Sequence, residues 1–119
     1  MAKTAAQAAE NNFVPPVCPM TSFVNLIAGK WAIPVLYRLI VLNAPLRFGE
    51  LLRAIAPITQ KELTRQLRLF EQRGLVSRRV YPEIPPRVEY QITELGLSMR
   101  EALQPLAEWM NHNGHRLRR

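Results

Sequence analysis

The chain has 119 residues, 48% hydrophobic and 21% charged, a balance typical of one folded domain and not of a disordered chain. Sixteen lysines and arginines against nine glutamates, with no aspartate, give a net charge of +7, which favours a negatively charged partner such as a nucleic acid. The single cysteine excludes an intrachain disulfide, and because no apolar run approaches about 18 residues and no apolar signal segment occurs, we expect a cytoplasmic protein without membrane contact.

Three helices are predicted in the first half of the chain. Apolar residues at helical spacing predict a helix over residues 20–28, which Gly29 would end. The next helix, over residues 32–42, is apolar on nearly every side, so we expect it to be buried on most sides, with Pro34 tolerated in its first turn. A third, shorter helix over residues 48–55 carries its apolar side chains on one face.

The stretch TQKELTRQLRLFEQRGLV contains the clearest helix of the chain. Its first residues form a capping box, in which the Thr59 hydroxyl accepts from the Glu62 amide and the Glu62 carboxylate accepts from the Thr59 amide. Gly74 is expected to end this helix, which spans residues 59–73. The apolar face of the helix consists of Leu63, Leu67 and Phe70.

After this helix the period of the pattern changes to that of a strand. LVSRRVY, residues 75–81, predicts one strand, and RVEYQI, residues 87–92, alternates strictly and predicts a second. The proline-rich PEIPP between them predicts a stiff turn, so the two segments should form a two-stranded hairpin. From Thr93 a long helix is expected to run to about residue 111, with a bend at Pro105. Its apolar positions are Leu95, Met99, Leu103, Leu106 and Met110.

The order of these elements predicts a mostly helical α+β domain, a winged helix-turn-helix. In this arrangement the second helix of the pair enters the DNA major groove, and the hairpin, or wing, contacts the flanking backbone or minor groove. We expect the domain to span residues 13–111, after a flexible arm over residues 1–12 and before a basic tail over residues 112–119.

The polar face of the capped helix carries the candidate DNA-binding residues. Arginine, lysine and glutamine side chains can read base edges in the major groove, and those near the helix start should approach the bases most closely. We therefore assign base contacts to Gln60, Lys61, Thr64 and Arg65, and a phosphate contact to Arg68. The alternative is that this face is simply solvated, as many basic helix faces are.

Two further arginines flank the stiff tip of the predicted wing. Adjacent prolines hold the tip extended, which lowers the entropy lost when it docks on DNA. Arg87 is the first choice for a wing contact and Arg79 the second. Cross-strand pairing with Glu83 or Glu89 is an equally weighted alternative for both arginines.

Several separate blocks resemble the HxlR-type transcriptional regulators, which are relatives of the MarR winged-helix group. The blocks are CPMTSFVNLIAGKW, RFGELLRAI, ITQKELTRQLRLFEQRGLVSRRVYPEIPPRVEYQITELG and LAEW, and they extend from residue 18 to about residue 109. The resemblance implies a homodimer whose N- and C-terminal helices form the interface. The last predicted helix independently favours a dimer, because it carries more apolar surface than one small domain needs. Two-fold symmetry then predicts a palindromic operator.

Cys18 precedes the first predicted helix and is a candidate sensor of oxidants or electrophiles. A helix N-terminus stabilises a thiolate, and some HxlR-type proteins use a cysteine at a matching place for sensing. With one cysteine per chain, any disulfide would join two chains or one chain and a small thiol. The alternative is a small buried hydrophobic side chain.

No constellation for catalysis, metal binding or cofactor binding is evident in the sequence. Two histidines near the end lack a third ligand, no serine has an evident His–acid partner, and no phosphate-binding glycine loop occurs. We therefore expect a regulator that is not an enzyme and uses no cofactor, with double-stranded DNA as its partner and an unknown small molecule or oxidant as candidate effector. Repression is the favoured output, because a small protein without an activation domain most simply blocks polymerase. The alternatives are a winged helix used for protein–protein contact and a non-specific nucleic-acid-binding protein.

Overall fold

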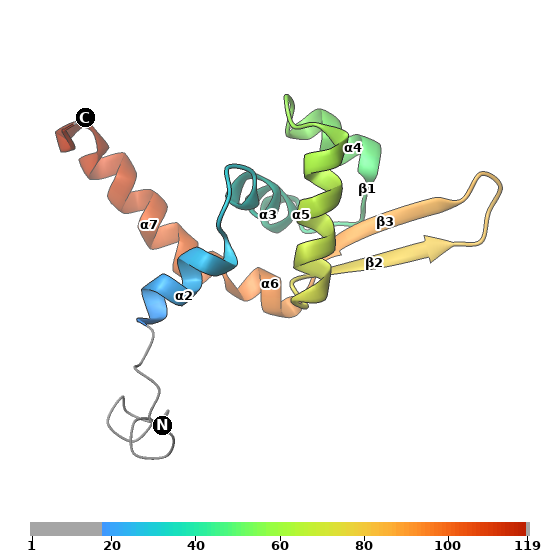
Figure 1. Cartoon of the computed structure of the whole chain (residues 1–119), viewed down its shortest axis with the longest axis horizontal. Helices are drawn as coiled ribbons and strands as arrows, with labels where there is room; N and C mark the ends of the chain where they lie inside the picture. The colour runs from blue at the N-terminus through green and yellow to red at the C-terminus, as the bar shows by residue number, and fades with distance from the viewer. Residues whose placement is uncertain (1–17, 119) are drawn as a thin grey trace, which may run out of the picture.

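A computed structural model describes residues 18–118 and shows a mostly helical chain with one small antiparallel sheet (Figure 1). The expected arm over residues 1–12 lies outside the described residues. The elements in chain order are α2 (Pro19–Leu26), α3 (Ala32–Leu42), β1 (Leu46–Arg47), α4 (Phe48–Ala54), α5 (Gln60–Gln72), β2 (Val76–Tyr81), β3 (Arg87–Ile92), α6 (Glu94–Ser98), α7 (Arg100–Asn113) and the 3-10 helix η1 (Gly114–Arg116). Helices α2 and α7 lie on one side of the molecule, and the β2–β3 hairpin extends from the opposite side (Figure 1). None of the helices in this part of the chain is long and apolar enough to span a bilayer.

Helix α3 lies at the centre of the hydrophobic core. Its fully buried residues are Ala32, Val35, Leu36, Leu39 and Ile40. They belong to one cluster with side chains from α4, α5, the sheet and α7, including Leu51, Leu63, Phe70, Ile92 and Leu103. The expectation that this helix is buried on most sides is wrong for one face, because Tyr37, Val41 and Leu42 are 45%, 55% and 44% exposed. Hydropathy alone does not separate a core face from an apolar surface face, and α3 has both.

The predicted capping box at the start of α5 is confirmed. The Glu62 amide donates to Thr59 Oγ1 at 3.1 Å, and the Thr59 amide donates to Glu62 Oε1 at 3.1 Å. Gly74 has a φ of 77°, a left-handed conformation that favours glycine and ends the helix. The predicted apolar face is buried, with Leu63, Leu67 and Phe70 no more than 1% exposed. The cap, the stop and the buried face together fix which way the polar face of α5 points.

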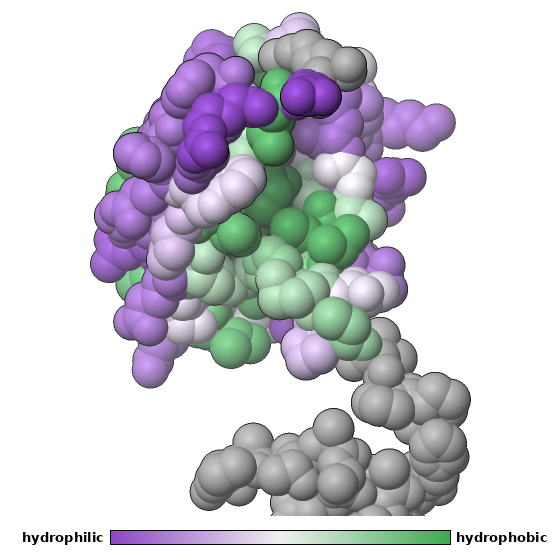
Figure 2. All heavy atoms as spheres, turned by 90° about the vertical axis from the view of Figure 1, so that its left-hand side faces the viewer, coloured by the Kyte–Doolittle hydropathy of each residue, from purple (hydrophilic) through white to green (hydrophobic). Residues whose placement is uncertain are grey.

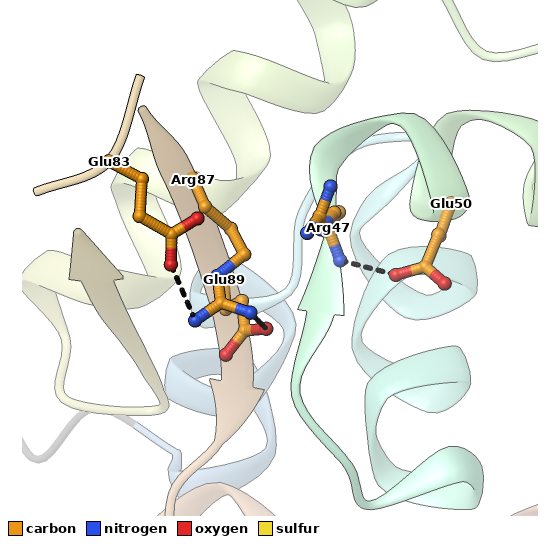
Figure 3. A network of polar contacts seen from close by, with 5 residues as sticks. All are labelled: Arg47, Glu50, Glu83, Arg87 and Glu89. Atoms are coloured by element: carbon orange, nitrogen blue, oxygen red, sulfur yellow. Dashed lines mark hydrogen bonds and ion pairs between the residues drawn. The ribbon is translucent and has the colours of Figure 1, made fainter. Parts of the chain in front are cut away.

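The predicted two-stranded hairpin is confirmed as β2 and β3, and the sheet has a third strand that the sequence analysis did not predict. Strand β1 pairs antiparallel with β3, with Leu46 opposite Tyr90 and Arg47 opposite Glu89, and the strand order is β1-β3-β2. A strand of two residues shows no alternation, which is why the sequence pattern does not reveal it. The Arg47 amide also donates to Glu50 Oε1 at 2.8 Å, so β1 leads directly into α4 (Figure 3).

The helix predicted over residues 93–111 is two helices in the structure. Helix α6 ends at Ser98 and α7 begins at Arg100, so the chain changes direction at Met99 (Figure 1). Pro105 lies inside α7 and does not separate the two segments. The helical spacing of apolar residues continues across the break, so periodicity does not locate it.

Thr93 anchors α6 against the turn that follows α5. Its hydroxyl accepts from the Gly96 amide at 3.1 Å and donates to the Gly74 carbonyl at 2.7 Å. Its amide donates to the Leu75 carbonyl at 3.0 Å. These bonds hold α6 below the end of α5, whereas α7 runs away from the domain toward the C-terminus (Figure 1).

Candidate nucleic-acid interface

The polar face of α5 lines an open groove of about 860 Å³. Lys61, Arg65 and Arg68 are exposed along it, and none of the lining residues is acidic. A polyanion lying along α5 would therefore meet three cations without a competing carboxylate in the groove. The α5 residues predicted to contact DNA all line this groove: Gln60, Lys61, Thr64, Arg65 and Arg68.

A smaller recess of about 320 Å³ links α5 to the sheet. It is lined by Thr64 and Arg68 of α5, by Arg78 and Tyr90 of the hairpin, and by Glu71. Arg78 lies opposite Tyr90 in the register of β2 and β3, and its side chain faces α5 across this recess. Arg78 is not among the residues selected from the sequence, although alternation along β2 would have placed it on this face of the sheet. The basic surface therefore continues from α5 onto the sheet.

The two arginines predicted as wing contacts are held within the hairpin. Arg87 Nη2 lies 3.1 Å from Glu83 Oε2, and Arg87 Nη1 lies 3.9 Å from Glu89 Oε2 (Figure 3). The guanidinium carbons of Arg87 and Arg79 lie 3.8 Å and 4.7 Å from the centre of the Tyr81 ring.

The structure therefore shows the pairing alternative for Arg87. Arg79 is exposed and forms no ion pair within residues 18–118. The side chains of Arg87 and Glu89 are partly buried, at 29% and 19% exposed, whereas that of Glu83 is 50% exposed. A DNA contact by either arginine stays a prediction.

A contact that the sequence does not reveal ties the start of α5 to the segment before α3. Trp31 Nε1 donates to Glu62 Oε2 at 2.9 Å, and Lys30 Nζ lies 5.0 Å from the centre of the Trp31 ring. The Thr59 amide, followed by the Thr59 hydroxyl, lowers the pKa of the Glu62 carboxyl, and Trp31 and Lys30 act in the same direction. Glu62 is thus ionised at neutral pH and serves both as the cap of α5 and as the acceptor for Trp31.

Cys18 is exposed and immediately precedes α2, so the alternative of a buried hydrophobic side chain is wrong. Hydrogen bonds from the amide of Thr21, and then from that of Met20, lower the pKa of the Cys18 thiol. A larger share of the thiol is therefore thiolate, the reactive form, at neutral pH. Across residues 18–118, no three histidine, cysteine or glutamate side chains gather to hold a metal ion.

A basic helix set beside a β-hairpin wing defines the class of winged helix-turn-helix proteins. Residues 26–118 match the family model of the HxlR-like helix-turn-helix, and the chain belongs to this family. An HTH-type transcriptional regulator of Methanothermobacter thermautotrophicus is 50% identical over 93 residues, which are 78% of this chain and 70% of that protein. YkvN, an HTH-type transcriptional regulator of Bacillus subtilis, is 51% identical over 85 residues, which are 71% of this chain and 70% of that protein.

Solved structures show the same fold. The redox regulator HypR in its reduced form gives a TM-score of 0.72 at 38% identity, over 81% of this chain and 93% of that chain. A MarR-family regulator from Porphyromonas gingivalis gives a TM-score of 0.72 at 33% identity, over 81% and 92% of the two chains. The predicted winged-helix fold is confirmed, and the chain is a transcriptional regulator with a helix-turn-helix DNA-binding domain. These relatives are regulators and not enzymes, in agreement with the expectation from the sequence.

Proposed function

We propose that this regulator recognises a specific sequence in double-stranded DNA, with α5 in the major groove and the β2–β3 hairpin on the flanking DNA. The observation that carries the proposal is the groove along α5, where Lys61, Arg65 and Arg68 face solvent and no lining residue is acidic. The cap at Thr59 and the buried face hold the helix, so these side chains extend from a rigid support. Arg78 adds a phosphate contact from the sheet side.

The functional unit in this proposal is a homodimer. Apolar side chains of α2, α3 and α7 are exposed on the side opposite the wing and surround an apolar groove of about 400 Å³ (Figure 2). Helices α2 and α7 contribute Met20, Val24, Leu106, Trp109 and Met110, which are 48–59% exposed. A second copy of this face would remove these side chains from water. Two-fold symmetry would then set the two α5 helices on the half-sites of a palindromic operator, roughly 34–36 Å apart.

Repression is the proposed output. A dimer bound across a promoter in the cytoplasm would cover the DNA that polymerase needs. The helices and strands of residues 18–118 form one DNA-binding domain with an exposed apolar face.

Replacing Arg65 with alanine is expected to weaken operator binding by about 1–3 kcal/mol and to relax the preference at one base pair. The operator would be obtained by selecting random duplexes with the purified protein. Fluorescence anisotropy at several salt concentrations would then measure the affinity for this operator and for a scrambled duplex. The wild type should bind the scrambled duplex roughly a thousandfold more weakly. Arg100→Ala, at the start of α7 and outside the groove, removes the same charge and should leave binding nearly unchanged.

The alternatives give different results in the same experiment. Equal affinity for both duplexes, with a steep salt dependence, would mean non-specific nucleic-acid binding. No duplex binding at low salt would favour the alternative in which the winged helix contacts another protein. If Arg65→Ala weakens binding to every duplex equally, Arg65 contacts a phosphate and not a base.

A second proposal is that oxidants control DNA binding through Cys18. Its exposure and its lowered thiol pKa support this role. Two relatives of known structure carry redox descriptions: HypR, solved in reduced and oxidized forms and 38% identical, and diamide-treated YodB of Bacillus subtilis, 32% identical. In the proposed reaction, two Cys18 thiols from two chains lose two electrons and two protons to the oxidant and form one disulfide.

Diamide is expected to release the wild-type protein from DNA but not Cys18→Ser, which replaces the thiol with a hydroxyl of similar size. The measurement is the anisotropy of a preformed DNA complex during a diamide titration, followed by non-reducing electrophoresis for the two-chain species and by reversal with dithiothreitol. Because the thiol pKa is lowered, the rate of Cys18 alkylation should rise with pH and reach its half-maximum at a lower pH than that of an ordinary cysteine in a short peptide. Equal release of both proteins would dismiss the sensor.

A further inference from the structure

A groove of about 450 Å³ lies between α3 and the end of α4, away from the polar face of α5, and shares Ile33 and Tyr37 with the apolar groove between α2, α3 and α7. Trp31, Tyr37 and Val41 contribute its apolar wall, and Arg38 is the one charged residue in the lining. None of the residues that line this groove lines the groove along α5. Its size and its apolar wall with a single charge are typical of a small-molecule site.

The guanidinium of Arg38 is free to bind an anion. Within residues 18–118, Arg38 makes one hydrogen bond, from Nη2 to the Ala54 carbonyl at 3.5 Å, which is long and weak. Within residues 18–118 no carboxylate lies within 4.0 Å of Arg38, and none of the groove's lining residues is acidic. A guanidinium binds a carboxylate through two parallel hydrogen bonds, a geometry that a neutral group does not match.

We propose that this groove binds a small apolar carboxylate, with the carboxylate on Arg38 and the apolar body between Trp31 and Tyr37. The charge of the ligand follows from Arg38, and its apolar body follows from the aromatic wall. The volume of about 450 Å³ has room for a carboxylate that carries a single ring or a short branched chain.

The groove is connected to α5 through Trp31, and this step rests on the proposed DNA binding. Trp31 lines the groove, and its indole N–H donates to Glu62 Oε2 at 2.9 Å. The other oxygen of Glu62 accepts from the Thr59 amide, where α5 begins. A ligand that displaces Trp31 therefore disturbs the cap of α5, and its negative charge lowers the attraction for DNA. Both effects predict that the ligand weakens DNA binding.

Sodium phenylacetate is the probe, and the readout on the free protein is the indole N–H signal of Trp31 in a ¹H–¹⁵N correlation spectrum. The chain has two tryptophans, so Trp109→Phe assigns the two signals. A saturable shift of the Trp31 signal is expected, and phenylacetamide, the uncharged analogue, should bind at least about tenfold more weakly. Arg38→Gln should weaken phenylacetate binding similarly, whereas Arg100→Gln should not change it.

Three results on the free protein would overturn the site: no saturation up to about 10 mM phenylacetate, equal binding by Arg38→Gln, or a shift of Trp109 alone. The link to α5 is tested separately, on the complex with the operator. Operator affinity is measured first without phenylacetate, so a failure of DNA binding is distinguishable from a failure of this site. Saturating phenylacetate should then lower DNA affinity at least about fivefold. Trp31→Phe, which keeps the aromatic wall but not the N–H, should bind phenylacetate and lose most of this effect. Unchanged DNA affinity in the wild type would overturn the link.

Discussion

Replacing both Leu106 and Met110 of α7 with glutamate is expected to yield a monomer whose affinity for a palindromic operator is about 100-fold lower or worse. Both side chains line the apolar groove between α2, α3 and α7, and they are 48% and 51% exposed. In the proposed dimer they are covered by the partner, so two charges per chain would be buried without a counter-ion. A monomer contacts one half-site, and the gain from holding both half-sites together is lost.

Light scattering after gel filtration would give the oligomeric state, and anisotropy with the selected operator would give the affinity. The matched control is Gln104→Glu with Asn111→Glu, which adds the same charge at exposed polar positions of α7 outside the groove. A loss of operator affinity in this control would assign the effect to charge and not to dimerisation. A double variant that stays dimeric would place the interface elsewhere on the molecule.

Replacing Gly96 with alanine is expected to lower the free energy of unfolding by about 3 kcal/mol, the upper end for overpacking. A methyl group at this position would overlap the backbone carbonyl of Leu75 and press on the side chain of Ile92. The carbonyl cannot move aside, because it accepts from the Thr93 amide at 3.0 Å in the bond that anchors α6. Relief would require α6 to separate from the turn that follows α5.

Urea unfolding followed by circular dichroism would measure this loss. Gly114→Ala is the matched control, since a methyl there meets only the end of the Met110 side chain at 3.7 Å, an ordinary contact. The control should be as stable as the wild type or slightly more stable, because alanine favours a helical conformation. Equal stability of the Gly96 variant and the control would mean that α6 does not pack closely against Leu75.

The sequence by itself determined the features that depend on neighbours a few residues apart. The Thr59–Glu62 capping box spans three residues, and the buried face of α5 follows from apolar side chains spaced by three and four. The same local rules predicted the hairpin strands and the stiff turn between them. Since these features also fix the polar face of α5, the candidate base-reading residues could be named before the structure was known.

The tertiary structure decided what depends on contacts distant in sequence. The pairing of β1 with β3 and the break at Met99 leave no periodic signal in the chain. The hydrogen bond from Trp31 to Glu62 joins residues 31 positions apart, and the clash that excludes a side chain at Gly96 comes from another segment. Apolar residues also read alike in a core and on an exposed face. Helix α3 has one buried side and one exposed side, which shares an apolar surface with α2 and α7. Only the packing of the whole chain distinguishes the two sides, because burial is a property of the assembled chain.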